Sequence, residues 1–201
     1  MRDFVGDRCA FGYDGDVSPG GHLLSTAAAC VASAALTGSL PLTAGIAIGG
    51  FLIDVDHALD YVLVERQRDL RPAAFLRYYM ERRPRRAVLV LHSYELFAIL
   101  TALAWWLQPL PLWGYLLGGF MHLGLDIIFN GESVPRSISA FYSFTYRLAH
   151  RFDTRALLGD AVPAMPHTFW GAFFAEFRFL GAGPSPRPAT PPSSESLPPP
   201  T

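Results

Sequence analysis

The sequence predicts an all-α fold, namely a multi-pass helical membrane protein with four core transmembrane helices in two hairpins, interfacial helices and a disordered Pro-rich tail. Three observations support this prediction. Hydrophobic residues make up 51% of the 201 positions. Residues 17–53 contain no Asp, Glu, Lys or Arg, and Glu95 is the only charged residue in residues 87–125. Long apolar stretches without charge are typical of membrane helices.

We divide the chain into a lead-in over residues 1–21, one domain over residues 22–180 and a tail over residues 181–201. The lead-in is rich in Gly and Asp and lacks the basic start of a secretory signal. We therefore expect the first apolar segment to remain as a membrane helix. The tail is dominated by Pro, Ser and Thr, which cannot build a hydrophobic core, so we expect it to be disordered.

The charge balance argues against one class of protein, and the cysteines argue against two kinds of structural site. The formal net charge is -1, which argues against a general nucleic-acid-binding protein, and we expect no direct nucleic-acid binding. Cys9 and Cys30 lie in unrelated contexts and form no CxxC pattern. Neither a disulfide framework nor a thiolate metal site is predicted.

The first predicted hairpin joins a helix over residues 22–38 to a helix that starts near Pro41. The first helix is rich in Ala and Ser, which allow close packing of helices in a membrane. Gly38 and Pro41 are typical turn residues, and Pro is tolerated at the first position of a helix. The second helix runs into the acidic cluster around Asp54, and it can extend to about Glu65.

Residues 65–86 form a basic segment that follows this cluster. The segment carries eight Arg against three acidic residues and contains several aromatic residues. We interpret it as an amphipathic surface segment that contacts anionic lipid headgroups. Because basic loops stay in the cytoplasm, both hairpin turns are predicted to face the exterior.

The second predicted hairpin consists of helices over residues 87–107 and 110–129. Trp105, Trp106, Trp113 and Tyr115 flank its uncharged turn, as aromatic residues do at a membrane interface. The aromatic segments 137–152 and 168–180 are predicted to be interfacial helices. The second of them is alternatively a short re-entrant helix.

The two hairpins also show an internal repeat. His22 precedes the Leu-Pro-Leu turn at Pro41 by the same distance along the chain as His92 precedes the turn at Pro111. Each turn is followed by a Gly-Gly-Phe triplet. The match is either a duplication or a chance similarity within an apolar sequence, and it places the polar ends of the second and fourth helices at equivalent positions.

The predicted topology groups the polar residues without help from the repeat. With the basic segment inside, the first and third helices begin at the cytoplasmic face, and the second and fourth helices end there. Four segments thus bring their His and Asp residues to one membrane level. These residues are His22, Asp54, Asp56, His57, His92, His122 and Asp126.

Imidazole and carboxylate groups together predict a divalent metal site. They suit zinc, manganese or iron better than calcium or magnesium, which prefer oxygen ligands alone, and zinc fits the ligand types best. His122 and Asp126 are spaced to share one face of a helix. The number of candidate ligands allows one ion or two, bridged by a carboxylate such as Asp54 or Asp56.

A metal-activated water predicts hydrolysis of an ester or phosphoester, including that of a lipid. Asp56 and Glu95 are the candidate catalytic residues. Glu95 follows His92 on nearly the same face of the predicted third helix, so it is expected to support a ligand or to act as a general base.

These motifs resemble the YdjM-like family of bacterial inner-membrane metal-dependent hydrolases, which is also described as LexA-binding. The resemblance covers about residues 22–131. It rests on His22 at the start of a small-residue helix, the Asp-x-Asp-His motif that ends at His57, the His-Ser pair at His92 and the His-x-x-x-Asp motif that ends at Asp126. These polar motifs are similar to those of zinc-dependent phospholipase C enzymes.

The resemblance implies a multi-pass protein of the bacterial inner membrane, with the seven His and Asp residues named above as metal ligands. Membrane lipids and a small-molecule or lipid ester are the expected partners, and a LexA-type partner is implied only by the family description. Two positions depart from the family pattern. Ile53 stands where the family has Pro, and Tyr94 and Glu95 interrupt the apolar run after the His-Ser pair, which leaves open whether Glu95 tunes or replaces a ligand.

Two other functions use the same features. In a metal-ion or proton transporter or channel, the His and Asp cluster would pass an ion across the membrane. In a non-catalytic membrane adaptor, the tail and the basic segment would bind partners and the cluster would be structural.

Overall fold

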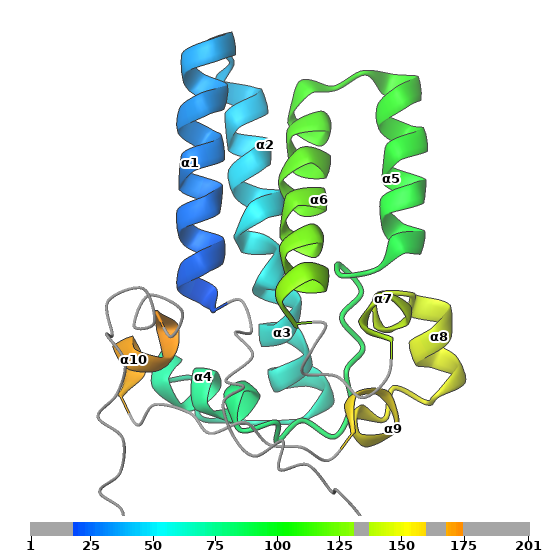
Figure 1. Ribbon diagram of the computed structural model, residues 1–201. Coiled ribbons are helices and arrows are strands. Elements are labelled where there is room, and N and C mark those ends of the chain that lie inside the picture. Colours follow the sequence, from blue (N-terminus) through cyan, green and yellow to red (C-terminus); the bar gives the residue numbers. More distant parts are fainter. Residues whose placement is uncertain (1–17, 131–136, 160–167, 175–201) are drawn as a thin grey trace, which may run out of the picture.

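The computed structural model describes residues 18–130, 137–159 and 168–174. These residues form an all-α structure in which four longer helices stand side by side and shorter helices lie beneath one end of them (Figure 1). The four longer helices are α1 (Pro19–Thr37), α2 (Leu40–Gly50), α5 (Tyr94–Leu107) and α6 (Leu110–Asn130). The predicted lead-in and tail lie almost entirely outside the described residues.

The first hairpin is formed as predicted, with α1 packed against α2. Its first helix begins at Pro19, before the predicted start, because the Ser18 side chain accepts the N–H of Gly21 and Pro occupies the first helical position. Gly38 ends α1 in the left-handed conformation, with φ 62°. His22 consequently lies in the first turn of α1.

Helices α2 and α6 are in backbone contact through glycines. A Cβ added to Gly45 would lie 2.2 Å from the Pro111 carbonyl oxygen, and one added to Gly118 would lie 2.3 Å from the Ile46 carbonyl oxygen. Gly49 and Gly114 are equally tight against the opposite helix. Both helices thus carry a Gly-x-x-x-Gly motif at equivalent positions of the sequence repeat, and the two motifs pack against each other.

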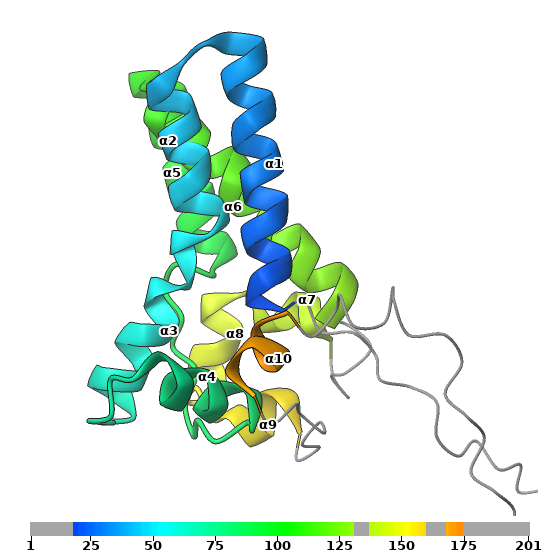
Figure 2. The same ribbon diagram turned by 90° about the vertical axis from the view of Figure 1, so that its left-hand side faces the viewer.

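The helix that carries the acidic cluster is broken. After α2 ends at Gly50, the chain continues through η1 (Leu52–Asp54), α3 (Val55–Leu59) and the π-helical η2 (Asp60–Val64), with a bend of 48° (Figure 2). The predicted extension to about Glu65 is therefore helical, but it consists of three short segments and is not one straight helix. Its outer face is apolar and exposed, and includes Leu52, Val55, Leu59, Val62 and Leu63.

The predicted helix start at residue 87 is wrong, because α5 begins only at Tyr94. The preceding residues form a loop whose backbone N–H groups bind carboxylates. Asp60 accepts the N–H groups of Val88 and Leu89, and Asp56 accepts that of Leu91. Because these carboxylates accept the backbone N–H groups in a non-helical conformation, the helix starts only at Tyr94.

Two helices are long and apolar enough to cross a membrane, Pro19–Thr37 and Leu110–Phe129. The count rises to three if α2 and the bent segment after it form one span. The 14 residues of α5 extend about 21 Å, which is less than the roughly 30 Å of membrane hydrocarbon. Four spans were predicted, and the described structure supports two to three by length and composition.

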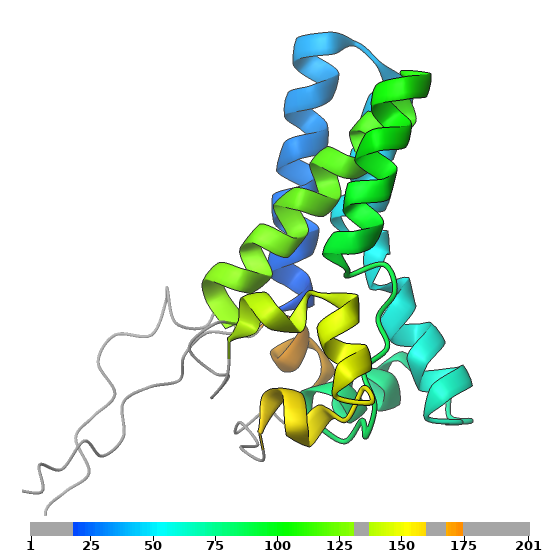
Figure 3. The same cartoon turned by 90° about the vertical axis from the view of Figure 1, so that its right-hand side faces the viewer.

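Short helices form the base beneath the bundle (Figure 3). The basic segment contributes α4 (Pro72–Met80), and the predicted helix over residues 137–152 is split into α7 (Ile138–Phe141) and α8 (Phe144–Ala149). They are followed by α9 (Thr154–Leu158) and α10 (Phe169–Phe173), and α10 packs against α4. The part of the predicted helix 168–180 beyond residue 174 lies outside the described residues.

Candidate metal centre

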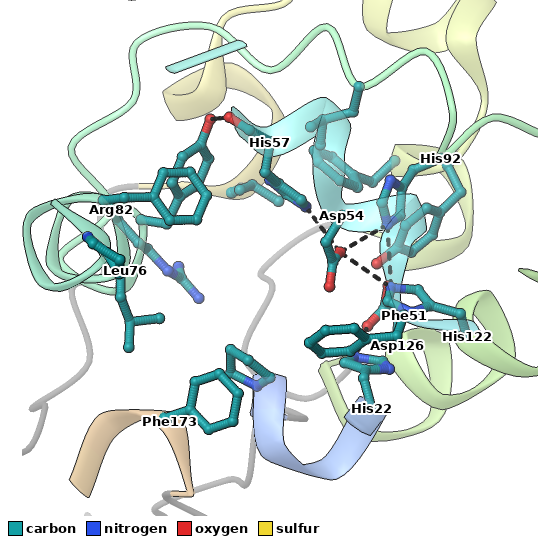
Figure 4. A pocket seen from close by; sticks show the side chains of 18 of the residues that line it. His22, Phe51, Asp54, His57, Leu76, Arg82, His92, His122, Asp126 and Phe173 are labelled. Atoms are coloured by element: carbon teal, nitrogen blue, oxygen red, sulfur yellow. Dashed lines mark hydrogen bonds and ion pairs between the residues drawn. The ribbon is translucent and has the colours of Figure 1, made fainter. Parts of the chain in front are cut away.

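A cavity of about 430 Å³ lies where the bundle meets its base (Figure 4). Six of the predicted ligands line it, and they come from four separate segments: His22 of α1, Asp54 and His57 near the bend, His92 of the loop before α5, and His122 with Asp126 of α6. Asp56 lies directly behind His92 and is buried. The structure therefore brings all seven predicted metal ligands to one end of the bundle.

His92 is held by Asp56. Its Nδ1 lies 3.0 Å from Asp56 Oδ1, while Asp56 Oδ2 accepts the backbone N–H groups of Leu91 and His92. Since Asp56 accepts the loop N–H groups as a carboxylate, we assign the Nδ1 proton to His92. The Nε2 atom of His92 then points away from Asp56 and is the atom available to a metal.

His122 is held in the same way by a backbone carbonyl. Its Nδ1 lies 2.9 Å from the Gly50 carbonyl oxygen. A carbonyl can only accept, so Nδ1 carries the proton and Nε2 presents a lone pair. Helix α2 ends at Gly50, where carbonyl groups are left without partners in the helix.

The two Nε2 atoms converge with a carboxylate oxygen. His92 Nε2 lies 3.2 Å from His122 Nε2, and Asp54 Oδ1 lies 3.4 Å from each of them. Three electron-pair donors thus surround one point, and both imidazoles are buried. A cation at this point would satisfy all three, which is the arrangement of a carboxylate, histidine and metal network.

In the metal-free protein a proton takes this position. Burial lowers the pKa of His92, but its hydrogen bonds to Asp54 and Asp56 outweigh burial and raise the pKa to about 10. The imidazole is therefore protonated at neutral pH and its Nε2–H faces Asp54 and His122. A divalent ion that binds here replaces that proton.

A second group of candidate ligands adjoins the first. His22 Nε2 lies 3.0 Å from Asp126 Oδ1, and His122 Nε2 lies 3.5 Å from Asp126 Oδ2. The His22 and His122 rings are stacked, with centroids 3.8 Å apart. His22 Nδ1 is buried and has no hydrogen-bond partner among the described residues, which is unusual for a polar atom and leaves it able to bind a ligand.

His57 belongs to a third group, with Asp56 and His92. Its Nε2 lies 3.8 Å from Asp54 Oδ1, and its Nδ1 is buried without a hydrogen-bond partner in the described part of the chain. Tyr79 of α4 donates a hydrogen bond to the His57 carbonyl oxygen. The first group shares His122 with the second group and His92 with the third. They therefore describe neighbouring parts of one centre.

Glu95 is not brought to the cluster. Its carboxylate accepts hydrogen bonds from the Ser143 hydroxyl and from the N–H groups of Phe144 and Thr145, which fixes α8 against α5. The expected common helical face with His92 is wrong because His92 lies in the loop before the helix begins. His150 lies outside the cluster and its Nδ1 donates to the Tyr146 carbonyl.

Sequence reasoning missed Arg147, which has 0% of its surface exposed. Its guanidinium donates to the carbonyl oxygens of Leu89, His92 and Phe141, and so fixes the loop that carries His92. The available signal was an Arg in an aromatic segment with no acidic residue one helical turn away. The same pattern is common at a membrane interface, so the sequence alone predicts an interfacial position for Arg147.

Comparison with known proteins adds no assignment, since no family model, no curated protein and no solved structure matches the chain. The candidate centre therefore rests on its own geometry. Its buried His and Asp groups can hold a metal ion, and the ligand types do not fix which one.

Proposed function

We propose that the protein is a membrane-associated, metal-dependent hydrolase that acts on an ester or phosphoester. The observation that carries the proposal is the convergence of His92 Nε2, His122 Nε2 and Asp54 Oδ1 on one point at the wall of a cavity. Two imidazoles and a carboxylate leave a further coordination position open, which is typical of catalytic rather than structural zinc sites.

The residues of the chain have distinct parts in this proposal. His92, His122 and Asp54 would hold a zinc-type ion, and His22 with Asp126 would hold a second ion beside it. When bound, such an ion polarises an ester or phosphoester oxygen and lowers the pKa of a coordinated water.

Asp56 is a positioning residue in this proposal, because both of its oxygens are bound by His92 and the loop N–H groups. Asp54 keeps 34% of its side chain exposed toward the cavity and is better placed to take a proton from an attacking water. The contacts of Glu95 with Ser143, Phe144 and Thr145 do not support the predicted catalytic role of this residue.

We further propose that α1, α2, α5 and α6 all lie in the bacterial inner membrane, with the basic segment and the centre on the cytoplasmic side. Exposed apolar residues along the bundle, including Leu36, Ile48, Ile99 and Leu117, support lipid contact. The short α5 lies beside α6 and would require local thinning of the membrane.

Metal analysis combined with a substrate panel tests the function. The purified full chain, loaded with zinc, is expected to hydrolyse a chromogenic phosphoester or carboxylic ester, and His122→Ala is expected to abolish the reaction. His150→Ala is the matched control and should retain full turnover. Zinc-loaded protein that turns over neither ester class contradicts the proposal.

A transporter of metal ions or protons is the second candidate, since ionisable residues at membrane depth commonly mark ion pathways. Against it, the backbones of α2 and α6 are in contact through Gly45, Gly49, Gly114 and Gly118 along the bundle beyond the centre. Proteoliposomes distinguish the two, because a transporter gives zinc or proton flux that depends on His122 and a hydrolase does not.

A further inference from the structure

Arg82 lies on the wall of the cavity that faces the metal centre. It is the only Arg or Lys among the described residues that line the cavity. Figure 4 shows its guanidinium directed into the cavity from the side opposite Asp54. An anion in the cavity would therefore lie between a permanent cation and the metal centre.

The backbone explains this placement. Helix α4 ends at Met80, and the chain then turns through a left-handed conformation at Arg82, with φ 48°. The turn carries the side chain back toward the bundle. Arg66 has the same left-handed conformation, with φ 54°, but it is exposed and does not line the cavity.

The rest of the cavity is largely apolar. Phe75 and Leu76 of α4 face Phe169 and Phe173 of α10, and Ile138 adds to this surface. Apolar walls with a few convergent polar groups are typical of small-molecule sites. A ligand that matches these walls carries an anionic group at one end and a hydrocarbon chain at the other.

The position of the cavity indicates where such a ligand comes from. It adjoins the bent segment, whose outer face exposes Leu52, Val55 and Leu59. Together with α2, the bent segment passes as one candidate membrane span. If this segment lies in the membrane, the cavity beside it lies at the level of membrane amphiphiles.

We infer that the cavity binds a phosphorylated amphiphile and that Arg82 is the specificity-determining residue for its phosphate. The planar guanidinium matches two phosphate oxygens, and a phosphate has further oxygens that can reach the metal centre at the same time. A carboxylate has only two oxygens and cannot satisfy both sides as well. The role of the metal in this inference rests on the proposed function.

Binding of hexadecylphosphonate, which has no ester to hydrolyse, tests the inference. The full chain in uncharged maltoside micelles is titrated with this probe by calorimetry, once loaded with zinc and once treated with EDTA. Arg82→Gly is expected to weaken binding by about tenfold or more in both forms, because a charge-assisted hydrogen bond is lost. Gly suits the left-handed backbone at this position, so the variant should fold.

Arg66→Gly is the matched control, since it removes the same charge from the same backbone conformation outside the cavity. It should bind the probe within about twofold of the unaltered protein, and Arg82→Lys should show an intermediate affinity. Equal affinities of Arg82→Gly and Arg66→Gly would overturn the role of Arg82.

Two further probes define the ligand class. Methylphosphonate is expected to bind far more weakly than hexadecylphosphonate, and hexadecanol is expected to show no dependence on Arg82. Methylphosphonate bound as tightly as the long-chain probe would overturn the inference in favour of a free phosphate. Zinc content is measured on every sample. If the protein takes up no metal but binds the probe in a manner that depends on Arg82, this inference is supported and the hydrolase proposal is contradicted.

Discussion

The Nε2 atoms of His92 and His122 face each other across 3.2 Å, although the two residues belong to different segments and each ring is fixed at its other nitrogen. Two lone pairs cannot be held this close without a proton or a cation between them. The fold therefore creates a position for a cation between these two nitrogen atoms.

Asp56→Asn should lower metal affinity by about 10- to 100-fold, because the amide no longer fixes the proton on His92 Nδ1 with a full negative charge. Competition with a zinc-binding dye measures the affinity. Asp60→Asn is the matched control, since Asp60 also holds this loop through Val88 and Leu89 but does not contact His92. Equal losses in both variants would show that Asp56 acts only through the loop.

Arg147→Met should destabilise the protein by roughly 3 kcal/mol, because the carbonyl groups of Leu89, His92 and Phe141 lose buried hydrogen bonds. We also expect weaker metal binding, since the same contacts hold the His92 loop. Chemical denaturation in detergent measures the first effect. Arg151→Met, which alters an exposed Arg in the same region, should leave both properties unchanged.

Gly118→Leu should prevent assembly of the bundle, since a Cβ at Gly118 would already lie 2.3 Å from the Ile46 carbonyl oxygen. Gly124→Leu in the same helix should be tolerated, because a Cβ there meets no atom within 4 Å. Size-exclusion chromatography and thermal unfolding compare the two. A well-folded Gly118→Leu protein would contradict the close packing of α2 and α6.

Metal affinity should fall as the pH is lowered. Since the pKa of His92 is raised to about 10, metal must displace a proton at neutral pH, and each unit of pH below that value weakens binding by up to about tenfold. The stability of the metal-free protein depends on pH in the opposite direction to the metal affinity. The stability that protonated His92 contributes is complete below its ordinary pKa of 6.5 and is lost as the pH rises through about 10.

Measured proton release checks this prediction. Titration of the metal-free protein with zinc in a weakly buffered solution at pH 8 should release about one proton for each ion bound. Zinc binding without proton release would contradict the assignment of the proton between His92 and His122.

Much of this arrangement follows from the sequence. Uncharged stretches with Pro and Gly at their ends predict the hairpins, and the position of the basic segment predicts that His22, Asp54, His92 and His122 share one end of the bundle. These features depend on composition and on the order of the segments along the chain. The repeated Gly-Gly-Phe triplets lie where α2 and α6 pack, a contact that the repeat by itself does not predict.

Other features depend on contacts between distant residues, which no local pattern encodes. Residues 87–93 are apolar enough for a helix, but Asp56 and Asp60 bind their backbone N–H groups and keep them in a loop. Glu95 has helical spacing from His92 only if that loop is a helix. Arg147 meets its carbonyl partners through the tertiary fold alone.

The most direct test of the central claim is the metal content of the purified protein. After loading with zinc and removal of excess ion, elemental analysis should find at least one ion per chain in the unaltered protein. The double variant His92→Ala with His122→Ala should retain almost none, while His150→Ala should retain the full amount. Absence of metal from the unaltered protein, or full occupancy in the double variant, would contradict the assignment of this cluster as a metal centre.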